Sequence, residues 1–172
     1  MKLTPDEFFH LKTELEITPL MTDEELYFIK SAHPQLYYST IGKHDQGVSL
    51  ITENTFIFSL KNETLNKFIC EKFDEPLENL YMIHRLIYGV GGHGKRHKDR
   101  FTTHKTVSII LSDKFEGGEM FINDKQIELN KKGDYVCFNG GTDWHEIKEI
   151  KKGHRDVLIV WFSKKQSKFS LI

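Results

Sequence analysis

The sequence predicts a mainly β domain with flanking N-terminal helices (α+β), and three observations lead to this fold class. The chain has 172 residues, which is enough for a single hydrophobic core. Apolar residues with helical spacing occur only in the first half. From residue 80 onward, short β-branched and aromatic runs alternate with glycine turns, as in a sandwich, jelly roll or barrel.

Three helices are expected in the first half. A Thr-Pro pair begins a helix over residues 5–16, in which apolar residues recur every three or four positions. Thr22 and Glu25 have the spacing of a capping box and begin a short helix that ends at His33-Pro34. The apolar residues within 65–69 indicate a third helix.

Strands are expected from β-branched and aromatic runs between turns. Residues 37–41 and 48–60 are predicted to pair around the turn at 45–47. Six further strands are predicted at 80–90, 106–111, 119–122, 126–129, 135–138 and 157–162. We expect one domain over 1–172, in which residues 1–78 support a jelly-roll core at 79–163.

Composition excludes several classes of protein. Hydrophobic residues make up 38% of the chain, and 24 basic residues balance 25 acidic ones, which is unlike a disordered polyelectrolyte. No apolar run is long enough to span a membrane, and the N-terminus lacks a signal-peptide pattern. We therefore expect a cytoplasmic protein with no membrane partner, whose two cysteines, Cys70 and Cys137, are reduced thiols in the core.

Charge is unevenly distributed along the chain. Residues 1–90 contain 8 basic and 14 acidic side chains, whereas residues 91–172 contain 16 and 11. The basic residues are densest at 94–100, which is typical of a solvated loop, a nucleic-acid patch or the rim of a site for an anion.

Two His-x-Asp triplets occur where about 0.5 is expected by chance, so neither is informative alone. His97 and Asp99 follow a predicted strand, and residues two apart on extended backbone point to the same side. His145 supplies a second imidazole from downstream. Two histidines and one carboxylate on one face of an octahedron suit non-haem Fe(II) that activates oxygen. The second triplet, at 154–156, has no histidine after it.

Arg155 lies ten residues after His145, at the head of an apolar strand. A guanidinium facing into a barrel must be paired, and its planar fork matches a carboxylate. A dicarboxylate cosubstrate would be such a partner. The alternative is a surface salt bridge to Asp156 or Glu149.

Five motifs in order resemble those of the 2-oxoglutarate and Fe(II)-dependent dioxygenases, in the branch similar to prolyl and lysyl hydroxylases. The resemblance runs from about Tyr81 to Phe162, roughly half of the chain. The motifs are a Tyr-containing strand and glycine turn before the His-x-Asp pair, a Thr-rich strand at 106–112, Gly-Gly-Glu at 117–119, Lys-Gly before an apolar strand at 132–138, and the distal His with a basic residue ten positions on.

The resemblance implies a double-stranded β-helix, the distorted jelly roll of that family. It implies that His97, Asp99 and His145 bind Fe(II), that Arg155 binds the distal carboxylate of 2-oxoglutarate, and that Tyr88 and, more weakly, Thr106 line this pocket. O2 is the other cosubstrate, succinate and CO2 are the products, and ascorbate is a further candidate cofactor. No side chain beyond the metal ligands is expected to be catalytic. Ile110 stands where some peptidyl hydroxylases have a tyrosine, which leaves the hydroxyl partner of the carboxylate open.

The expected reaction is hydroxylation of an unactivated C–H bond, with peptidyl proline or lysine favoured as the substrate. Small molecules and nucleic acids are the alternatives. The nucleic-acid branch carries a second Arg six positions after the first, where this chain has Trp161. The candidate substrate rim contains Lys95, Arg96, Arg100 and Trp161, and the segments 91–96 and 99–105 could clamp a peptide. From other classes, a jelly roll that binds a partner without catalysis and a cupin-like isomerase both stay open, and the sequence does not determine the oligomeric state.

Overall fold

In the computed structural model, the described residues are 1–32 and 50–164. They contain helices α1 (Pro5–Ile17), α2 (Asp23–Ala32) and α4 (Glu63–Lys72) and the short 3-10 helix η1 (Leu77–Asn79). The strands are β1 (Leu50–Ile51), β2 (Asn54–Ile57), β3 (Leu80–Tyr88), β4 (His93–His97), β5 (Thr103–Ile110), β6 (Phe115–Gly117), β7 (Met120–Ile122), β8 (Lys125–Ile127), β9 (Tyr135–Phe138), β10 (His145–Ile147), β11 (Ile150–Gly153) and β12 (Arg155–Ser163).

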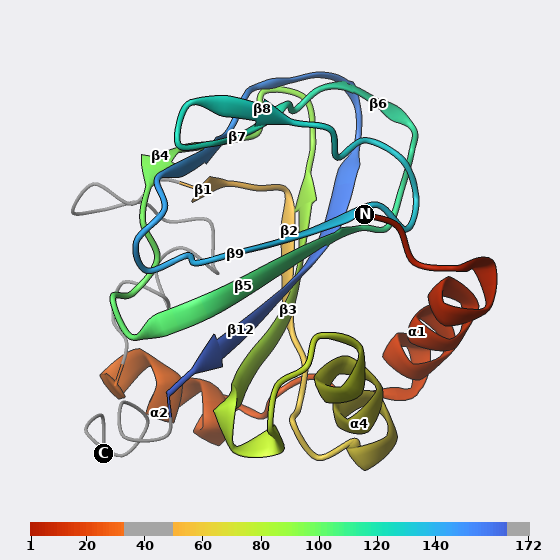
Figure 1. Cartoon of the computed structure of the whole chain (residues 1–172), viewed down its shortest axis with the longest axis vertical. Helices are drawn as coiled ribbons and strands as arrows, with labels where there is room; N and C mark the ends of the chain where they lie inside the picture. Colours follow the sequence, from red (N-terminus) through yellow and green to blue (C-terminus); the bar gives the residue numbers. More distant parts are fainter. Residues whose placement is uncertain (33–49, 165–172) are drawn as a thin grey trace.

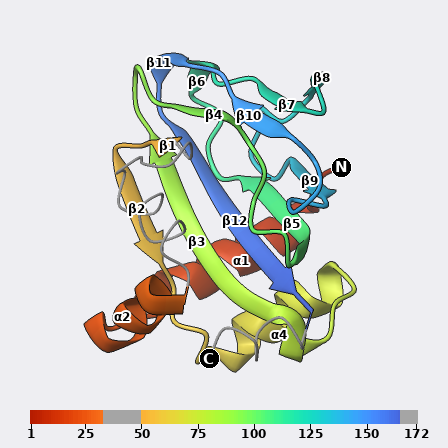
Figure 2. The same ribbon diagram turned by 90° about the vertical axis from the view of Figure 1, so that its left-hand side faces the viewer.

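The described strands form two five-stranded sheets and a two-stranded ribbon. The major sheet has the order β2-β3-β12-β5-β9, the minor sheet has the order β1-β4-β10-β7-β8, and β11 pairs with β6. Every named pair is antiparallel. Figures 1 and 2 show the two sheets stacked, with the chain passing repeatedly from one to the other. This is the predicted double-stranded β-helix.

The three predicted helices are confirmed. In α1, the Thr4 hydroxyl accepts a hydrogen bond from the Glu7 amide, and the Glu7 carboxylate accepts one from the Thr4 amide. Thr22 and Glu25 make the same reciprocal contacts before α2. Such capping boxes satisfy amides that the first helical turn leaves without partners. The predicted end at His33-Pro34 lies outside the described residues.

The strand predictions hold from residue 80 onward, with corrections elsewhere. The predicted single strand at 48–60 is wrong within its described part, because β1 pairs with β4 in the minor sheet and β2 pairs with β3 in the major sheet. The predicted strand at 37–41 lies outside the described residues. Strands β4, β6, β10 and β11 were not predicted. The segment 91–96, considered above as a possible peptide clamp, mostly belongs to β4, which is hydrogen-bonded on both sides by β1 and β10.

Two hydrophobic clusters cover the two faces of the major sheet. On the outer face, Leu11 of α1 and Ile69 of α4 pack with Val107 and Leu158. Figure 2 shows α1 passing behind β3 and β12 on this side. The inner face contributes Leu86, Ile110 and Val157 to a cluster with residues of the minor sheet and its ribbon. Alternate residues of β12 therefore point to opposite faces, as the period of two in a strand requires.

The cysteine prediction and the membrane prediction can be checked in the described residues. Neither Cys70 nor Cys137 forms a disulfide among the described residues; Cys70 is buried in the outer cluster and Cys137 is partly buried against it. None of the helices in the described part of the chain has the length and apolar character needed to cross a bilayer.

Candidate metal and carboxylate site

Three side chains of types that bind metals converge at the adjoining ends of two strands in the minor sheet. His97 ends β4, His145 begins β10, and these two residues are directly paired across the ladder. Asp99 follows two residues after His97. One donor atom from each of the three lies within 4.8 Å of the others, and no other such cluster occurs among the described residues. The ladder register therefore brings together residues that are 46 and 48 positions apart in the chain.

The distances within this trio fit the coordination sphere of a small divalent cation. Asp99 Oδ1 lies 3.2 Å from His145 Nε2 and 3.7 Å from His97 Nε2. Two ligand atoms at about 2.1 Å from a metal and at right angles to each other are about 3.0 Å apart. The separation from His145 is close to this value, and the separation from His97 is longer. The donor set, two imidazoles and one carboxylate, is the facial triad that suits Fe(II).

Both imidazoles are oriented by backbone carbonyls. His97 Nδ1 lies 2.5 Å from the Lys95 carbonyl oxygen, and His145 Nδ1 lies 2.9 Å from that of Asp143. A carbonyl only accepts, so each Nδ1 carries the hydrogen in these contacts and donates it. The lone pair of each neutral ring is then on Nε2, the atom that faces Asp99. This assignment of the hydrogens follows from the hydrogen-bond partners.

The trio is largely removed from solvent, which alters its acid–base properties. Burial by itself raises the pKa of the Asp99 carboxyl, but hydrogen bonds from His145 and Thr106 and the charges of both imidazoles outweigh it and lower that pKa. Burial and repulsion from His145 lower the pKa of His97. Burial opposes protonation of His145, but Asp99 outweighs it and raises the pKa of His145. Without a metal, the contact between His145 Nε2 and Asp99 Oδ1 is a hydrogen bond only when His145 is protonated, and a bound cation would take the place of that proton.

Arg155 is enclosed on the inner face of the major sheet without an acidic partner. Its side chain is 1% exposed, and its Nε and Nη2 atoms have no hydrogen-bond partner among the described residues. Burial lowers the pKa of the guanidinium to about 10, so the group is still charged at neutral pH. The predicted alternative, a surface salt bridge to Asp156 or Glu149, is wrong, because the Asp156 carboxylate pairs with Arg85 on the opposite face.

Arg155 lies next to the phenol ring of Tyr88 and to the backbone of Gly118. Tyr88 pairs with Arg155 in the ladder, and the guanidinium carbon lies 5.8 Å from the centre of its ring. Burial raises the pKa of the Tyr88 phenol to about 12, so this group is a neutral hydrogen-bonding hydroxyl. A Cβ on Gly118 would come within 3.0 Å of Arg155 Cδ. An unpaired, enclosed guanidinium of this kind fits a ligand carboxylate.

The predicted substrate-rim residues and Thr106 differ in exposure and in the groups that they contact. Lys95 and Arg96 are exposed on β4, and Arg96 forms an ion pair with Asp124 at 3.2 Å. Arg100 is partly buried in the loop after Asp99. Trp161 lies on β12, and its indole packs against neighbouring aromatic rings of β3. Thr106 contacts Asp99 rather than Arg155, since its hydroxyl donates to Asp99 Oδ2 at 2.8 Å.

Sequence reasoning missed several residues around the trio. The Gly140 carbonyl accepts a hydrogen bond from the Asp99 amide, and there is no room for a Cβ on Gly140 beside the Asp99 carboxylate. The charged groups of Arg96 and Lys98 lie over the ring of Trp144, with Arg96 Cζ 4.5 Å and Lys98 Nζ 4.8 Å from the ring centre. His84 is 1% exposed with neither ring nitrogen bonded within the described residues. Of these residues only Gly140 has a signal in the sequence, because it lies in the turn-forming Asn-Gly-Gly run at 139–141.

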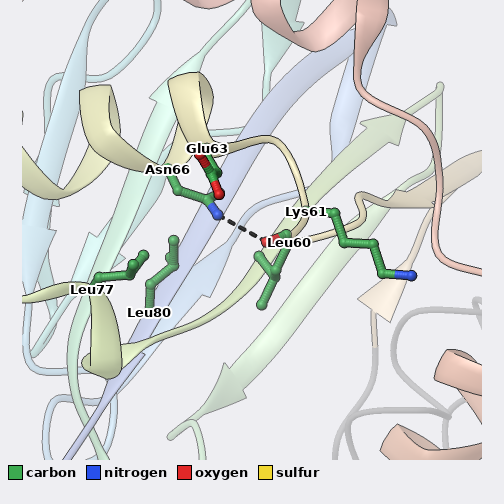
Figure 3. Close-up of a pocket in the computed structure, with 6 residues that line it drawn as sticks. All are labelled: Leu60, Lys61, Glu63, Asn66, Leu77 and Leu80. Carbon is green, nitrogen blue, oxygen red and sulfur yellow. Dashed lines mark hydrogen bonds between the residues drawn. The ribbon is translucent and has the colours of Figure 1, made fainter.

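A surface pocket of about 490 Å³ lies elsewhere, beside the start of α4 and η1. Figure 3 shows the residues that line it, Leu60, Lys61, Glu63, Asn66, Leu77 and Leu80, with the Asn66 amide donating to the Leu60 carbonyl at 2.9 Å. None of the predicted site residues lines this pocket. It is therefore separate from the trio and from Arg155.

Comparisons with known proteins agree with this geometry. Residues 82–163 match the family model of the 2OG-Fe(II) oxygenase superfamily. The crystal structure of a viral collagen prolyl hydroxylase from Paramecium bursaria Chlorella virus-1, a 2OG complex, aligns with a TM-score of 0.55 and 17% identity over 86% of this chain and 93% of that chain. A truncated form of the same protein aligns with a TM-score of 0.53 and 18% identity over 64% and 74%. No curated protein matches this chain.

Proposed function

Because residues 82–163 make this chain a member of the 2OG-Fe(II) oxygenase superfamily, we propose that it hydroxylates an unactivated C–H bond in a peptidyl proline or lysine. The family implies Fe(II) as the metal and 2-oxoglutarate as the cosubstrate. The observation that carries the proposal is that one fold contains both a cluster of three potential metal ligands, His97, Asp99 and His145, and a buried guanidinium without an acidic partner, that of Arg155.

In this proposal the trio holds the iron. His97 and His145 present Nε2, because their Nδ1 hydrogens are donated to backbone carbonyls. Asp99 presents Oδ1, the carboxylate oxygen that faces both rings. Bound Fe(II) supplies the redox chemistry, in which O2 and 2-oxoglutarate are converted to succinate and CO2 while the substrate carbon gains a hydroxyl group.

Arg155 and Tyr88 are proposed to bind the distal carboxylate of 2-oxoglutarate. The guanidinium is buried without an acidic partner, so a ligand carboxylate would replace the hydration that the group has lost. Tyr88 stays protonated at neutral pH because its pKa is raised to about 12, so its hydroxyl can donate a second hydrogen bond. Tyr88 belongs to the same buried cluster as Leu86, Ile110 and Val157, and this apolar cluster would keep water from the bound carboxylate.

A peptide is favoured over a nucleic acid by the state of the basic rim. Arg96 is paired with Asp124 and packs over Trp144, so its charge is partly neutralised. The position six residues after Arg155 is Trp161 rather than a second arginine. The name of the viral relative states that it hydroxylates prolyl residues of collagen. Peptides containing proline or lysine are therefore the substrates to test first.

The test uses purified protein loaded with Fe(II), 2-oxoglutarate and O2, with and without ascorbate. We expect succinate by NMR and a gain of one oxygen atom on proline-containing or lysine-containing peptides by mass spectrometry. Asp99→Asn and His97→Ala should abolish both products. The matched control is His93→Gln, on the same strand as His97 but outside the trio, which should retain them.

Two outcomes contradict the proposal. If Asp99→Asn and His97→Ala still produce succinate, the trio does not hold the reacting metal. If the unaltered protein shows no metal-dependent binding of 2-oxoglutarate, the chain is a binding module rather than an oxygenase. If free metabolites or methylated nucleic acid are hydroxylated and peptides are not, the proposed reaction is correct but the proposed substrate class is wrong.

A further inference from the structure

We propose that Thr106 and Gly140 are positioning residues that restrict Asp99 to a single oxygen toward the metal. This inference rests on the proposed function. A carboxylate can bind a cation through one oxygen or through both. In this structure the two oxygens of Asp99 have different neighbours, and those neighbours decide which of the two is available.

The first observation is that the two carboxylate oxygens of Asp99 have different neighbours. Oδ1 faces His145 Nε2 at 3.2 Å and His97 Nε2 at 3.7 Å. Oδ2 accepts a hydrogen bond of 2.8 Å from the Thr106 hydroxyl. Thr106 is buried and the Asp99 side chain is only 7% exposed, so water competes little for this contact. The hydroxyl therefore holds Oδ2 away from the point on which the three donors converge.

The second observation is that the turn at 139–141 packs directly against this hydrogen bond. The Asp99 amide donates to the Gly140 carbonyl at 2.8 Å, which fixes the ligand's backbone. A Cβ on Gly140 would overlap both Asp99 Oδ2 and Thr106 Oγ1. The carboxylate is thus enclosed between the turn and β5, with little freedom to rotate about its terminal bond.

The consequence follows from counting coordination positions. An octahedral ion has six, and the trio takes three when each residue provides one atom. Three then remain, two for the keto-acid end of 2-oxoglutarate and one for O2. If Asp99 bound through both oxygens, only two would remain, and the carboxylate would compete with the cosubstrate. Thr106 is therefore expected to affect 2-oxoglutarate binding more than metal binding.

The experiment measures binding with Co(II), which reports its coordination through visible absorption and needs no turnover. Thr106→Val removes the hydroxyl and keeps the shape, whereas Thr106→Ser keeps the hydroxyl. For Thr106→Val we expect 2-oxoglutarate affinity for the Co(II) protein, measured by calorimetry, to fall by about 10-fold to 100-fold, with a changed absorption band and a smaller change in Co(II) affinity. Thr106→Ser should restore both the affinity and the band.

The control is Ser108→Ala, which removes a buried hydroxyl two residues along the same face of the same strand. It should leave the Co(II) spectrum and 2-oxoglutarate affinity unchanged. The inference is overturned if Thr106→Val binds 2-oxoglutarate as tightly as the unaltered protein, or if Thr106→Ser behaves like Thr106→Val. If Thr106→Val does not fold, Gly140→Ala tests the same enclosure: a changed Co(II) absorption band with weakened 2-oxoglutarate binding supports it, and an unchanged band and affinity refute it.

Failure of this inference is distinguishable from failure of the proposed function. The unaltered protein's conversion of 2-oxoglutarate to succinate with Fe(II) tests the function without reference to Thr106. If succinate forms and Thr106→Val has the unaltered Co(II) spectrum, the function stands and the positioning role falls. If no succinate forms but Thr106→Val changes the spectrum as expected, the positioning role stands at a metal site with another use.

Discussion

Replacing Arg155 with methionine is expected to stabilise the ligand-free protein while removing its response to 2-oxoglutarate. The guanidinium is fully enclosed, and no acidic group pairs with it in the described part of the chain. Burial lowers its pKa from 12.5 to about 10. At about 1.4 kcal/mol for each pKa unit, the folded state disfavours the charged form by about 3 kcal/mol.

Methionine has a similar length and no charge, so it removes this cost and keeps most of the packing. Some contacts of the longer side chain are lost, and we therefore expect the free energy of unfolding to rise by about 1 to 3 kcal/mol. For the unaltered protein with bound metal, 2-oxoglutarate at a hundredfold excess over its dissociation constant adds about 2.7 kcal/mol. For Arg155→Met it should add almost nothing, because the carboxylate loses its partner.

Urea unfolding followed by circular dichroism measures both effects, with Mn(II) present and with 2-oxoglutarate either present or absent. The matched control is Arg85→Met, which removes an arginine from the neighbouring strand that does have a partner, Asp156. That variant should lose stability and keep the response to 2-oxoglutarate. The reasoning is refuted if Arg155→Met unfolds at lower urea than the unaltered protein, or if the cosubstrate stabilises both equally.

Three further predictions concern stability. Burial lowers the pKa of His84 from 6.5 to about 4, so the unfolded chain takes up a proton before the folded protein does as the pH falls. Between about pH 7.5 and pH 5, the free energy of unfolding should therefore fall by about 2 kcal/mol more in the unaltered protein than in His84→Gln. Equal losses in the two proteins would contradict this. Gly153 has φ +74°, and a Cβ there would overlap the Lys114 carbonyl oxygen, whereas Gly91 also has a positive φ but has room for a Cβ. Gly153→Ala should therefore lower the free energy of unfolding more than Gly91→Ala in the same urea assay. Burial raises the pKa of Glu75, but hydrogen bonds, including one with His104, outweigh it and lower that pKa. The unaltered protein should therefore have a higher free energy of unfolding than Glu75→Gln above about pH 4.5, and this difference should shrink below that pH in acid unfolding curves. A difference that stays constant with pH would argue against this.

Much of the fold could be predicted because local patterns agree with the tertiary structure. The capping box at Thr22 and Glu25 is satisfied by contacts within three residues, so it reports the helix start directly. The strand at 157–162 is buried on both faces in the centre of the major sheet, and its unbroken apolar run shows this. By contrast, β4 contains two histidines, a glycine and two basic residues, and its neighbours β1 and β10 alone make it a strand.

The sequence by itself determined the chemistry that the chain can present: two histidines and an aspartate, an arginine ten residues beyond the distal histidine, and a β-rich core to hold them. Only the tertiary structure decided which oxygen of Asp99 faces the imidazoles, that Thr106 contacts this ligand rather than Arg155, and that Arg155 is buried without an acidic partner. Side-chain identity limits which bonds a residue can form. Which bonds do form depends on ladder register and on turns such as that at Gly140, and these join segments far apart in the chain.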